Sequence, residues 1–264
     1  MPAIARSEPF RGQGPCPLGV CDGSGWILGP EDVARACECR EKRLRSGRSR
    51  GVASAIPARY RGVSFDRPPV SDMARDMTSR HVVQAARDFC ENLDRKLEDG
   101  DGLWLMGDTG TGKTTLAMLV SKAALQDSRS VAIYSLPKLL ARIRRSYDAE
   151  HGEQSYSELF ERLASVDLLH IDDLGAEKQT EWVLEQLYAL VNERYESQRS
   201  LVVTTNLPED ELEKQIGVRV VSRLVEICGN PRPLFGPDRR VQVSADAATS
   251  LGEGAGSALG PLDH

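Results

Sequence analysis

Eight residues from Gly107 to Thr114 have the types and spacing of a phosphate-binding loop. They read Gly-Asp-Thr-Gly-Thr-Gly-Lys-Thr and match the Walker A pattern Gly-x4-Gly-Lys-Thr. Lys113 can reach the β- and γ-phosphates of ATP, and the Thr114 hydroxyl can bind Mg²⁺. The alternative is a glycine-rich turn that matches by chance. The expected ATP-binding residues of the loop are Gly107, Asp108, Thr109, Gly110, Thr111, Gly112, Lys113, Thr114 and Thr115.

An acidic pair follows the apolar run that begins at Leu168. Because this run predicts a buried strand, Asp172 and Asp173 are expected at its carboxyl end, beside the phosphate-binding loop. We expect Asp172 to hold the hydration shell of Mg²⁺ and Asp173 to orient or activate the attacking water. The alternative is a helix cap after a core strand. Many ATPases of this kind carry Glu at the second position, and the shorter Asp173 predicts weak intrinsic hydrolysis.

A third polar group ends the next apolar run. Asn206 follows Val202-Val-Thr-Thr205 and could hydrogen-bond the γ-phosphate or the lytic water. Asn also commonly starts turns, which is the alternative. Its position, one helix and one strand after the acidic pair, favours a role in catalysis.

Four cysteines fall within 24 residues near the N-terminus. Cys16, Cys21, Cys37 and Cys39 have the spacing Cys-x4-Cys-x15-Cys-x-Cys. Zn²⁺ prefers four tetrahedral ligands, and a segment this short has no apolar core of its own, so the pattern predicts a structural zinc site. Free thiols are the alternative. Cys90 and Cys228 lie in apolar helical patterns and are expected in the core.

The remaining pattern alternates apolar strands with amphipathic helices. Helices are expected over 81–98, 113–125, 136–146, 157–164 and 181–197, and strands over 103–106, 130–135, 166–171 and 201–205. This order predicts an α/β fold with a parallel sheet covered by helices on both faces. The expected domains are a disordered segment 1–15, a zinc module 16–50, a linker 51–78, an ATPase domain 79–243 and a disordered tail 244–264.

The composition limits where partners could bind. The chain has 264 residues and a net charge of −5, so any contact with nucleic acid must come from a local basic patch. One candidate is 136–147, where Lys138, Arg142 and Arg145 share a helical face and Tyr147 could stack on a base. The basic run 40–61 is a second candidate, and a solvated charged face is the alternative for both. No signal peptide or membrane span is evident, which predicts a cytoplasmic protein.

Taken together, these motifs resemble the AAA+ superfamily of P-loop ATPases. More narrowly, residues 16–241 look like the replicative helicase loaders of the DnaC/DnaI type, which are close to the IstB-like helper ATPases of transposases. Besides the Walker A run, the likeness rests on Ile56-Pro-Ala-Arg-Tyr60, Asp172-Asp-Leu-Gly-Ala-Glu177, Asn192-Glu-Arg-Tyr195, Thr204-Thr-Asn206, Val218-Arg-Val-Val-Ser-Arg-Leu224 and Gly236-Pro-Asp-Arg-Arg240.

The resemblance implies features that the spacing alone does not. Arg223 matches the arginine finger that completes the ATP site of a neighbouring subunit, and Arg219 is a weaker candidate. Arg240 matches the second sensor arginine, which contacts the γ-phosphate within its own subunit. Surface arginines are the alternative for each. The chain has no room for a C-terminal lid domain after residue 241, and the cysteine-rich module resembles one that contacts the helicase.

The expected function is therefore ATP-dependent loading of a hexameric replicative helicase onto single-stranded DNA, with self-association through the ATP site. The expected cofactors are ATP, Mg²⁺ and Zn²⁺. Two alternatives remain open. One is an IstB-like helper ATPase of a transposase. The other is a nucleotide-gated adaptor that hydrolyses ATP negligibly.

Overall fold

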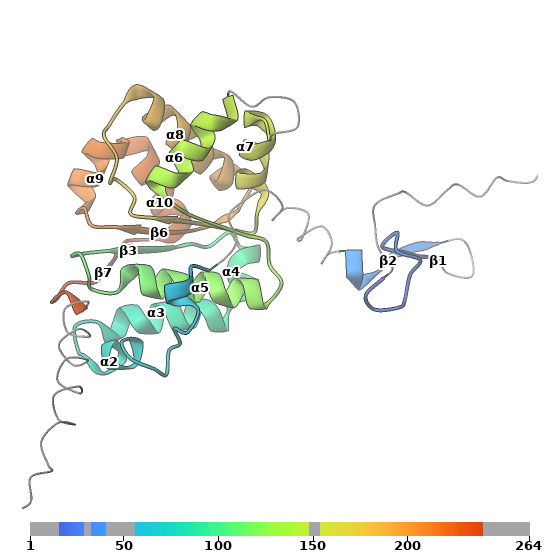
Figure 1. Cartoon of the computed structure of the whole chain (residues 1–264), viewed down its shortest axis with the longest axis horizontal. Coiled ribbons are helices and arrows are strands. Elements are labelled where there is room, and N and C mark those ends of the chain that lie inside the picture. The colour runs from blue at the N-terminus through green and yellow to red at the C-terminus, as the bar shows by residue number, and fades with distance from the viewer. Residues whose placement is uncertain (1–15, 29–32, 41–55, 148–153, 240–264) are drawn as a thin grey trace, which may run out of the picture.

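The computed structural model describes residues 16–28, 33–40, 56–147 and 154–239 (Figure 1). The expected disordered segments 1–15 and 244–264 lie outside these ranges, as do 41–55 of the basic run and Arg240. None of the helices in the described ranges is long and apolar enough to cross a membrane.

A parallel sheet of five strands forms the centre of the ATPase domain. Its strand order is β4-β5-β6-β3-β7. The strands are β3 (Leu103–Met106), β4 (Val131–Ser135), β5 (Leu168–Asp172), β6 (Ser200–Thr205) and β7 (Arg232–Pro233). Each described pairing is parallel, which confirms the predicted sheet. Because β6 lies between β3 and β5, the three strands bring their carboxyl ends to one edge.

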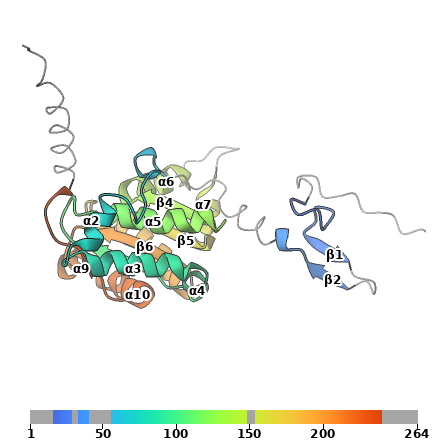
Figure 2. The ribbon, with the colours of Figure 1, turned by 90° about the horizontal axis from the view of Figure 1, so that it is seen from below.

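Helices cover both faces of the sheet (Figures 1 and 2). One face carries α2 (Val70–Arg75), α3 (Arg80–Glu91), α4 (Leu93–Glu98) and α5 (Lys113–Gln126). The other carries α6 (Leu136–Tyr147), α7 (Tyr156–Ser165), α8 (Glu181–Glu196), α9 (Glu209–Ile216) and α10 (Val218–Cys228). β7 is the last element of the described residues, which contain no lid domain.

Side chains alternate between two cores along each strand. Trp104 of β3 packs on the α6–α10 side, whereas Leu103 and Leu105 pack with α3 and α5. Both faces of the strand are therefore apolar, which is why the sequence shows an uninterrupted apolar run instead of alternation.

Residues 56–78 fold onto the ATPase domain, whereas the sequence analysis assigned them to a linker. They contain the 3-10 helix η1 (Ala58–Tyr60) and α2. Tyr60, Val70 and Met73 are buried in the same core as α3 and α5. The described part of the expected linker is thus an N-terminal extension of this domain.

The N-terminal module is a small separate unit. Strand β1 (Trp26–Leu28) pairs antiparallel with β2 (Ala34–Ala36), and Trp26 faces Ala36 across the pair. The Arg40 guanidinium lies 3.8 Å from the Trp26 ring centroid and covers it. The module has little apolar core, as its length predicts.

Three helical features differ from the sequence expectation. The expected helix 81–98 is broken at Asn92, which separates α3 from α4. Helices α9 and α10 were given no bounds in the sequence analysis, although Cys228 was assigned to an apolar helical pattern and α10 buries Val220, Val221, Leu224 and Ile227.

Candidate functional site

The phosphate-binding loop follows β3 and leads into α5. Gly107, Gly110 and Gly112 have φ values of 141°, 80° and 109°, a region that side chains rarely adopt. At Gly107 a Cβ would also collide with the Leu234 carbonyl. The glycines therefore allow the backbone to turn tightly into the first turn of α5, where helix N–H groups favour phosphate.

Lys113 is almost fully buried at the centre of the loop. Its Nζ donates to the carbonyls of Gly107, at 2.8 Å, and Asp108, at 2.6 Å. The Thr111 hydroxyl also donates to the Asp108 carbonyl, at 2.8 Å. The ammonium is thus held inside the curve of the loop, where phosphate oxygens would lie.

The structure brings Thr114 and Asp172 into direct contact. The Thr114 hydroxyl donates to Asp172 Oδ1 over 2.9 Å, although the two residues are 58 positions apart. Thr204 donates to the same oxygen over 2.7 Å. A hydroxyl and a carboxylate at this separation are hard oxygen ligands of the kind that Mg²⁺ binds beside phosphates. The donor set therefore fits the expected cation.

Thr204 is a functional candidate that the sequence analysis did not single out. Besides binding Asp172, its hydroxyl accepts a hydrogen bond of 3.0 Å from the backbone N–H of Asp173. Asp173 adopts the left-handed conformation, with φ 57°. Thr204 thus holds both members of the acidic pair from the neighbouring strand, and the Thr-Thr-Asn run was the available signal.

A cavity of about 490 Å³ joins most of the expected site. Of the expected residues, those that line it are Thr109, Gly110, Gly112, Lys113, Thr114, Thr115, Asp173 and Asn206. A larger cavity of about 670 Å³ lies between α7 and α8, but it contains none of these groups. The expected site residues therefore gather at the smaller cavity.

One wall of the cavity comes from the N-terminal extension. Arg59, Tyr60, Val63 and Pro69 line it opposite the phosphate-binding loop. The Arg59 guanidinium lies 4.6 Å from the Tyr60 ring centroid. An aromatic and apolar wall of this kind suits the flat face of a nucleotide base. The sequence analysis cited Ile56-Pro-Ala-Arg-Tyr60 only as a family motif and missed its place in the site.

The end of the described chain crosses the phosphate-binding loop. Leu234 N–H donates to the Met106 carbonyl at 2.7 Å, and Arg239 N–H donates to the Gly110 carbonyl at 3.1 Å. The Arg239 side chain lines the cavity and pairs with Asp76 at 3.1 Å. Arg240, the expected sensor, lies outside the described residues, and its neighbour Arg239 lines the cavity together with Arg59.

Arg223 lies on α10, away from this cavity. Among the described residues that line the cavity, none belongs to α10. The Arg223 Nη1 lies 3.0 Å from Glu226, and its guanidinium lies 4.0 Å from the Tyr195 ring centroid. Arg219, one turn earlier on α10, is exposed. Neither arginine lines the cavity of its own subunit.

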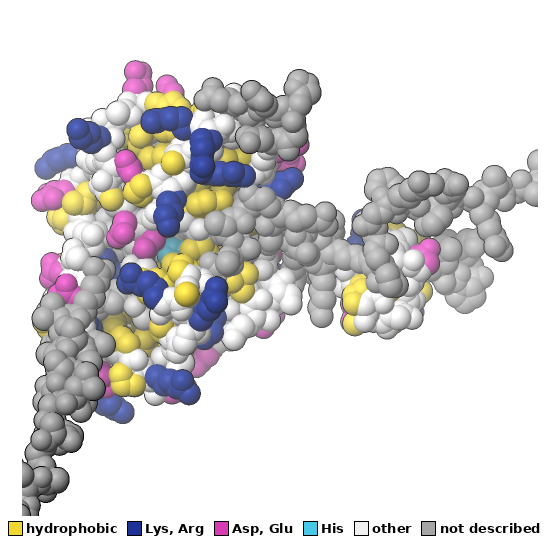
Figure 3. Space-filling model, viewed as in Figure 1, with side chains coloured by type: hydrophobic (Ala, Val, Ile, Leu, Met, Phe, Trp, Pro, Cys, Tyr) yellow, Lys and Arg dark blue, Asp and Glu magenta, His cyan; other side chains and the backbone are white. Residues whose placement is uncertain are grey.

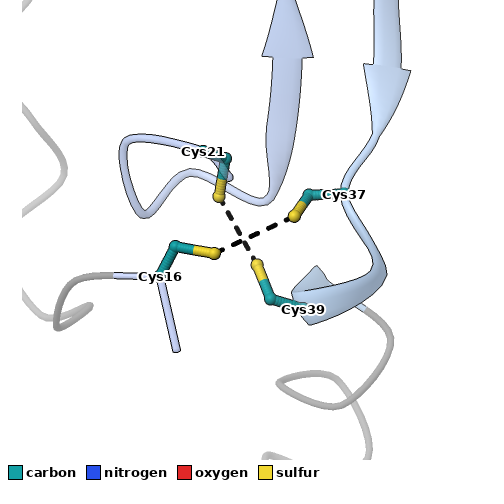
Figure 4. Close-up of side chains that lie close together, drawn as sticks. All are labelled: Cys16, Cys21, Cys37 and Cys39. Atoms are coloured by element: carbon teal, nitrogen blue, oxygen red, sulfur yellow. Dashed lines mark hydrogen bonds between the residues drawn. The ribbon is translucent and has the colours of Figure 1, made fainter. Parts of the chain in front are cut away.

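The four N-terminal thiols converge on one point (Figure 4). All four Sγ atoms lie within 4.8 Å of one another, with Cys16–Cys37 at 3.9 Å and Cys21–Cys39 at 3.4 Å. A tetrahedral zinc with Zn–S bonds of about 2.3 Å requires sulfur separations of about 3.8 Å. The thiols therefore fit a four-cysteine metal site.

The thiols differ in acidity. The backbone N–H of Cys21 lowers the pKa of the Cys16 thiol to about 5, whereas burial raises the pKa of Cys39. A bound cation would favour the thiolate form of all four cysteines.

The basic face of α6 is partly engaged within the protein. Leu139, Leu140 and Ile143 are buried, as the helical spacing predicts. Arg142 donates to Gln154 at 3.0 Å, and Tyr147 stacks on Tyr156 with the ring centroids 4.6 Å apart.

Lys138, Arg144 and Arg145 of α6 are exposed. In Figure 3 basic side chains lie among hydrophobic ones over this part of the molecule. The exposed groups and half of the Tyr147 side chain remain available to a partner.

Comparison with known proteins relates the chain to ATP-binding proteins of DNA transactions. It is 31% identical over 172 residues to YdaV of Escherichia coli K12, covering 65% of each protein. It is 33% identical over 131 residues to y4pL of Sinorhizobium fredii, named as an insertion sequence ATP-binding protein, covering 50% of this chain and 46% of the relative. The chain thus matches less than two thirds of the length of these curated relatives.

A solved structure of the DnaC helicase loader has the same fold. It aligns with a TM-score of 0.56 and 23% identity over 69% of this chain and all of that one. The model of the family described as IstB-like ATP binding protein matches residues 74–224, which is more than half of the chain and includes the phosphate-binding loop, the acidic pair and Arg223. The chain is also similar to helicase loaders named DnaC and DnaI. The chain therefore belongs to the family of IstB-like ATP-binding proteins.

Proposed function

We propose that this chain is an ATPase that loads a hexameric replicative helicase onto single-stranded DNA. The observation that carries the ATPase proposal is the contact between Thr114 and Asp172 beside the buried Lys113. Two separate motifs, the phosphate-binding loop and the acidic pair, thereby meet beside the cavity that Lys113, Thr114 and Asp173 line. The loading proposal rests on the joining of this domain to a four-cysteine module and on the relatives named as helicase loaders.

The residues divide the work of hydrolysis among them. The backbone of the loop and Lys113 hold the β- and γ-phosphates, and the base lies against Tyr60 and Val63. Thr114 and Asp172 hold Mg²⁺, which supplies charge neutralisation at the phosphates. Asp173 and Asn206, which line the same cavity, orient the attacking water. Arg239 and Arg59 are the described arginines that line the cavity from the same subunit.

Hydrolysis requires a second subunit in this proposal. Arg223 lies on α10 and does not line the cavity of its own chain, so it acts on ATP bound by a neighbour. Self-association through the ATP site thereby couples the nucleotide state to assembly.

Replacing Lys113 with alanine is expected to abolish ATP binding or hydrolysis. Lys113 is the buried cation of the loop, and its ammonium is placed to neutralise the β- and γ-phosphates. Binding of a fluorescent ATP analogue measures the loss. Lys214→Ala is the control, because Lys214 is exposed on α9 and does not line the cavity. Wild-type affinity in a folded Lys113→Ala protein would contradict the site.

The loading proposal is tested with the purified hexameric helicase of the same cell and a circular single strand. The circle has no end to thread, so helicase retained on it must have been opened and loaded. We expect ATP-dependent retention with the wild-type chain and none with Lys113→Ala. The α6 variant Lys138→Glu/Arg145→Glu should lower retention and its salt dependence, because both side chains are exposed and can neutralise phosphates.

The same assay separates the alternatives. Helicase that never associates with the chain, while a transposase of the same cell does, would favour the role of a transposase helper, and one relative is named as an insertion sequence ATP-binding protein. Loading that proceeds with ATP and equally with a non-hydrolysable analogue would favour a nucleotide-gated adaptor. The short Asp173 is the observation that favours this adaptor.

A further inference from the structure

Arg223 has two neighbours in its own subunit that the roles above do not use. Its guanidinium carbon lies 4.0 Å from the centroid of the Tyr195 ring, within the range of a cation–π contact. On the other side, Arg223 Nη1 pairs with Glu226 Oε1 at 3.0 Å, one helical turn further along α10. The side chain is one-third exposed, so the remaining N–H groups stay accessible.

The helix turn that carries Tyr195 is anchored by the residue beside it. Arg194 is fully buried and donates to the carbonyls of Leu163, at 2.7 Å, and Ser200, at 2.5 Å. These bonds tie the last turn of α8 to the end of α7 and the start of β6. Tyr195 itself packs against the α6–α10 core. The ring that supports Arg223 is therefore part of a rigid surface.

Glu226 acts on both members of the contact. By hydrogen bonding and charge, Glu226 raises the pKa of the Tyr195 hydroxyl, while Arg223 opposes this shift. The three side chains thus form one charged cluster across α8 and α10, which pack closely against each other. The cluster accounts for Tyr195 of the Asn192-Glu-Arg-Tyr195 motif, and the buried bonds of Arg194 account for its neighbour. The proposed function assigns no role to either residue.

A long arginine side chain needs such support if it is to act on another molecule. A free arginine samples many rotamers, and ordering it at the moment of contact costs free energy. Support from an aromatic face and a carboxylate reduces that cost in advance. The support differs from a buried ion pair because it leaves part of the guanidinium open.

We infer that Tyr195 and Glu226 are positioning residues that hold the Arg223 guanidinium ready for the nucleotide of a neighbouring subunit. The inference rests on the proposed function of Arg223. On this inference, the ends of α8 and α10 form the surface that contacts the ATP site of a neighbouring subunit.

The test compares Tyr195→Leu with Tyr195→Phe. Leucine keeps an apolar side chain on the core but removes the ring, whereas phenylalanine keeps the ring and removes only the hydroxyl. We expect Tyr195→Leu to lower kcat for ATP hydrolysis roughly 2- to 5-fold, as an exposed cation–π contact predicts. Adding Glu226→Gln should extend the loss up to roughly 25-fold. KM for ATP should not change, and Tyr195→Phe should retain wild-type kcat.

Mixing subunits separates positioning from a structural role. In a mixture of the double variant Tyr195→Leu/Glu226→Gln with Lys113→Ala, an intact phosphate-binding loop meets a correctly held Arg223 of the other chain. Activity above the sum of the two separate proteins is therefore expected. A subunit that is merely damaged would not recover in this way.

A second readout does not depend on turnover. Light scattering in the presence of a non-hydrolysable ATP analogue should detect weaker self-association of the double variant than of Tyr195→Phe. The positioning role alone would be overturned if Tyr195→Leu and the double variant matched wild type in both kcat and self-association while Arg223→Ala was inactive. An Arg223→Ala protein with wild-type activity would instead overturn the proposed function.

Discussion

Replacing Arg223 with alanine is expected to leave the affinity for ATP unchanged and to lower the rate of hydrolysis by about 10³- to 10⁵-fold. The affinity should persist because Arg223 does not line the cavity that contains Lys113. The rate should fall because an arginine from a neighbour stabilises charge that develops only in the transition state. The short Asp173 predicts a slow basal rate, so the loss should lie nearer the lower value. Steady-state hydrolysis and equilibrium binding measure the two effects.

Complementation identifies the subunit on which Arg223 acts. Arg223→Ala and Lys113→Ala are each expected to be inactive alone. A mixed assembly pairs the intact loop of the first with the intact Arg223 of the second, so partial recovery is expected. Arg219→Ala is the matched control, since Arg219 is exposed one turn earlier on the same helix. A mixture that stays inactive, although light scattering detects mixed oligomers, would mean that Arg223 does not act between subunits.

The sheet was predictable because its strands are apolar on both faces. β3, β4, β5 and β6 each lie within one or two residues of an expected strand. Their order could not be read from the sequence, because it depends on which strands meet in space. β7 is only Arg232–Pro233 and carries no apolar run, and it is defined by its pairing with Leu105 and Met106.

The candidate site was predictable where its residues are contiguous. The run Gly107 to Thr114 contains the loop, Lys113 and the expected magnesium ligand Thr114, so the local pattern is sufficient to predict them. Tyr60 and Arg239 could not be found in this way. They lie more than 40 and more than 120 residues from the loop, and only the packing of η1 and the hydrogen bonds of the final segment bring them to it.

Arg239 is the neighbour of the expected sensor, and the prediction for Arg240 itself lies outside the described residues. The family motif assigns the sensor role to Arg240, and the two arginines are adjacent. The Arg239 side chain lines the cavity and pairs with Asp76. Because Asp76 belongs to the extension that also contributes Tyr60 and Val63 to the cavity, this pair links the extension to the final segment of the described ATPase domain.

Removal of zinc is expected to unfold the N-terminal module and spare the ATPase domain. Structural zinc contributes about 10–16 kcal/mol of apparent folding free energy in small modules. The hairpin of β1 and β2 has three residues in each strand, so it cannot replace that contribution with an apolar core. The ATPase domain has two extensive cores on the faces of its sheet and none of the four clustered thiols. Its stability should therefore not depend on the metal.

Metal analysis and hydrogen exchange test this directly. We expect about one zinc per chain in protein purified without chelators. After chelation, amide protection should be lost in residues 16–28 and 33–40 and retained in α5 and β6. Cys39→Ser should behave as the chelated protein does, because it removes one of the four ligands. Cys90→Ser is the matched control, since this thiol lies on α3 outside the cluster. Full amide protection of the module in metal-free protein would contradict the prediction, because the module would then fold without a metal. Loss of helicase loading in Cys39→Ser, with ATP binding intact, would further connect the module to the partner instead of the nucleotide.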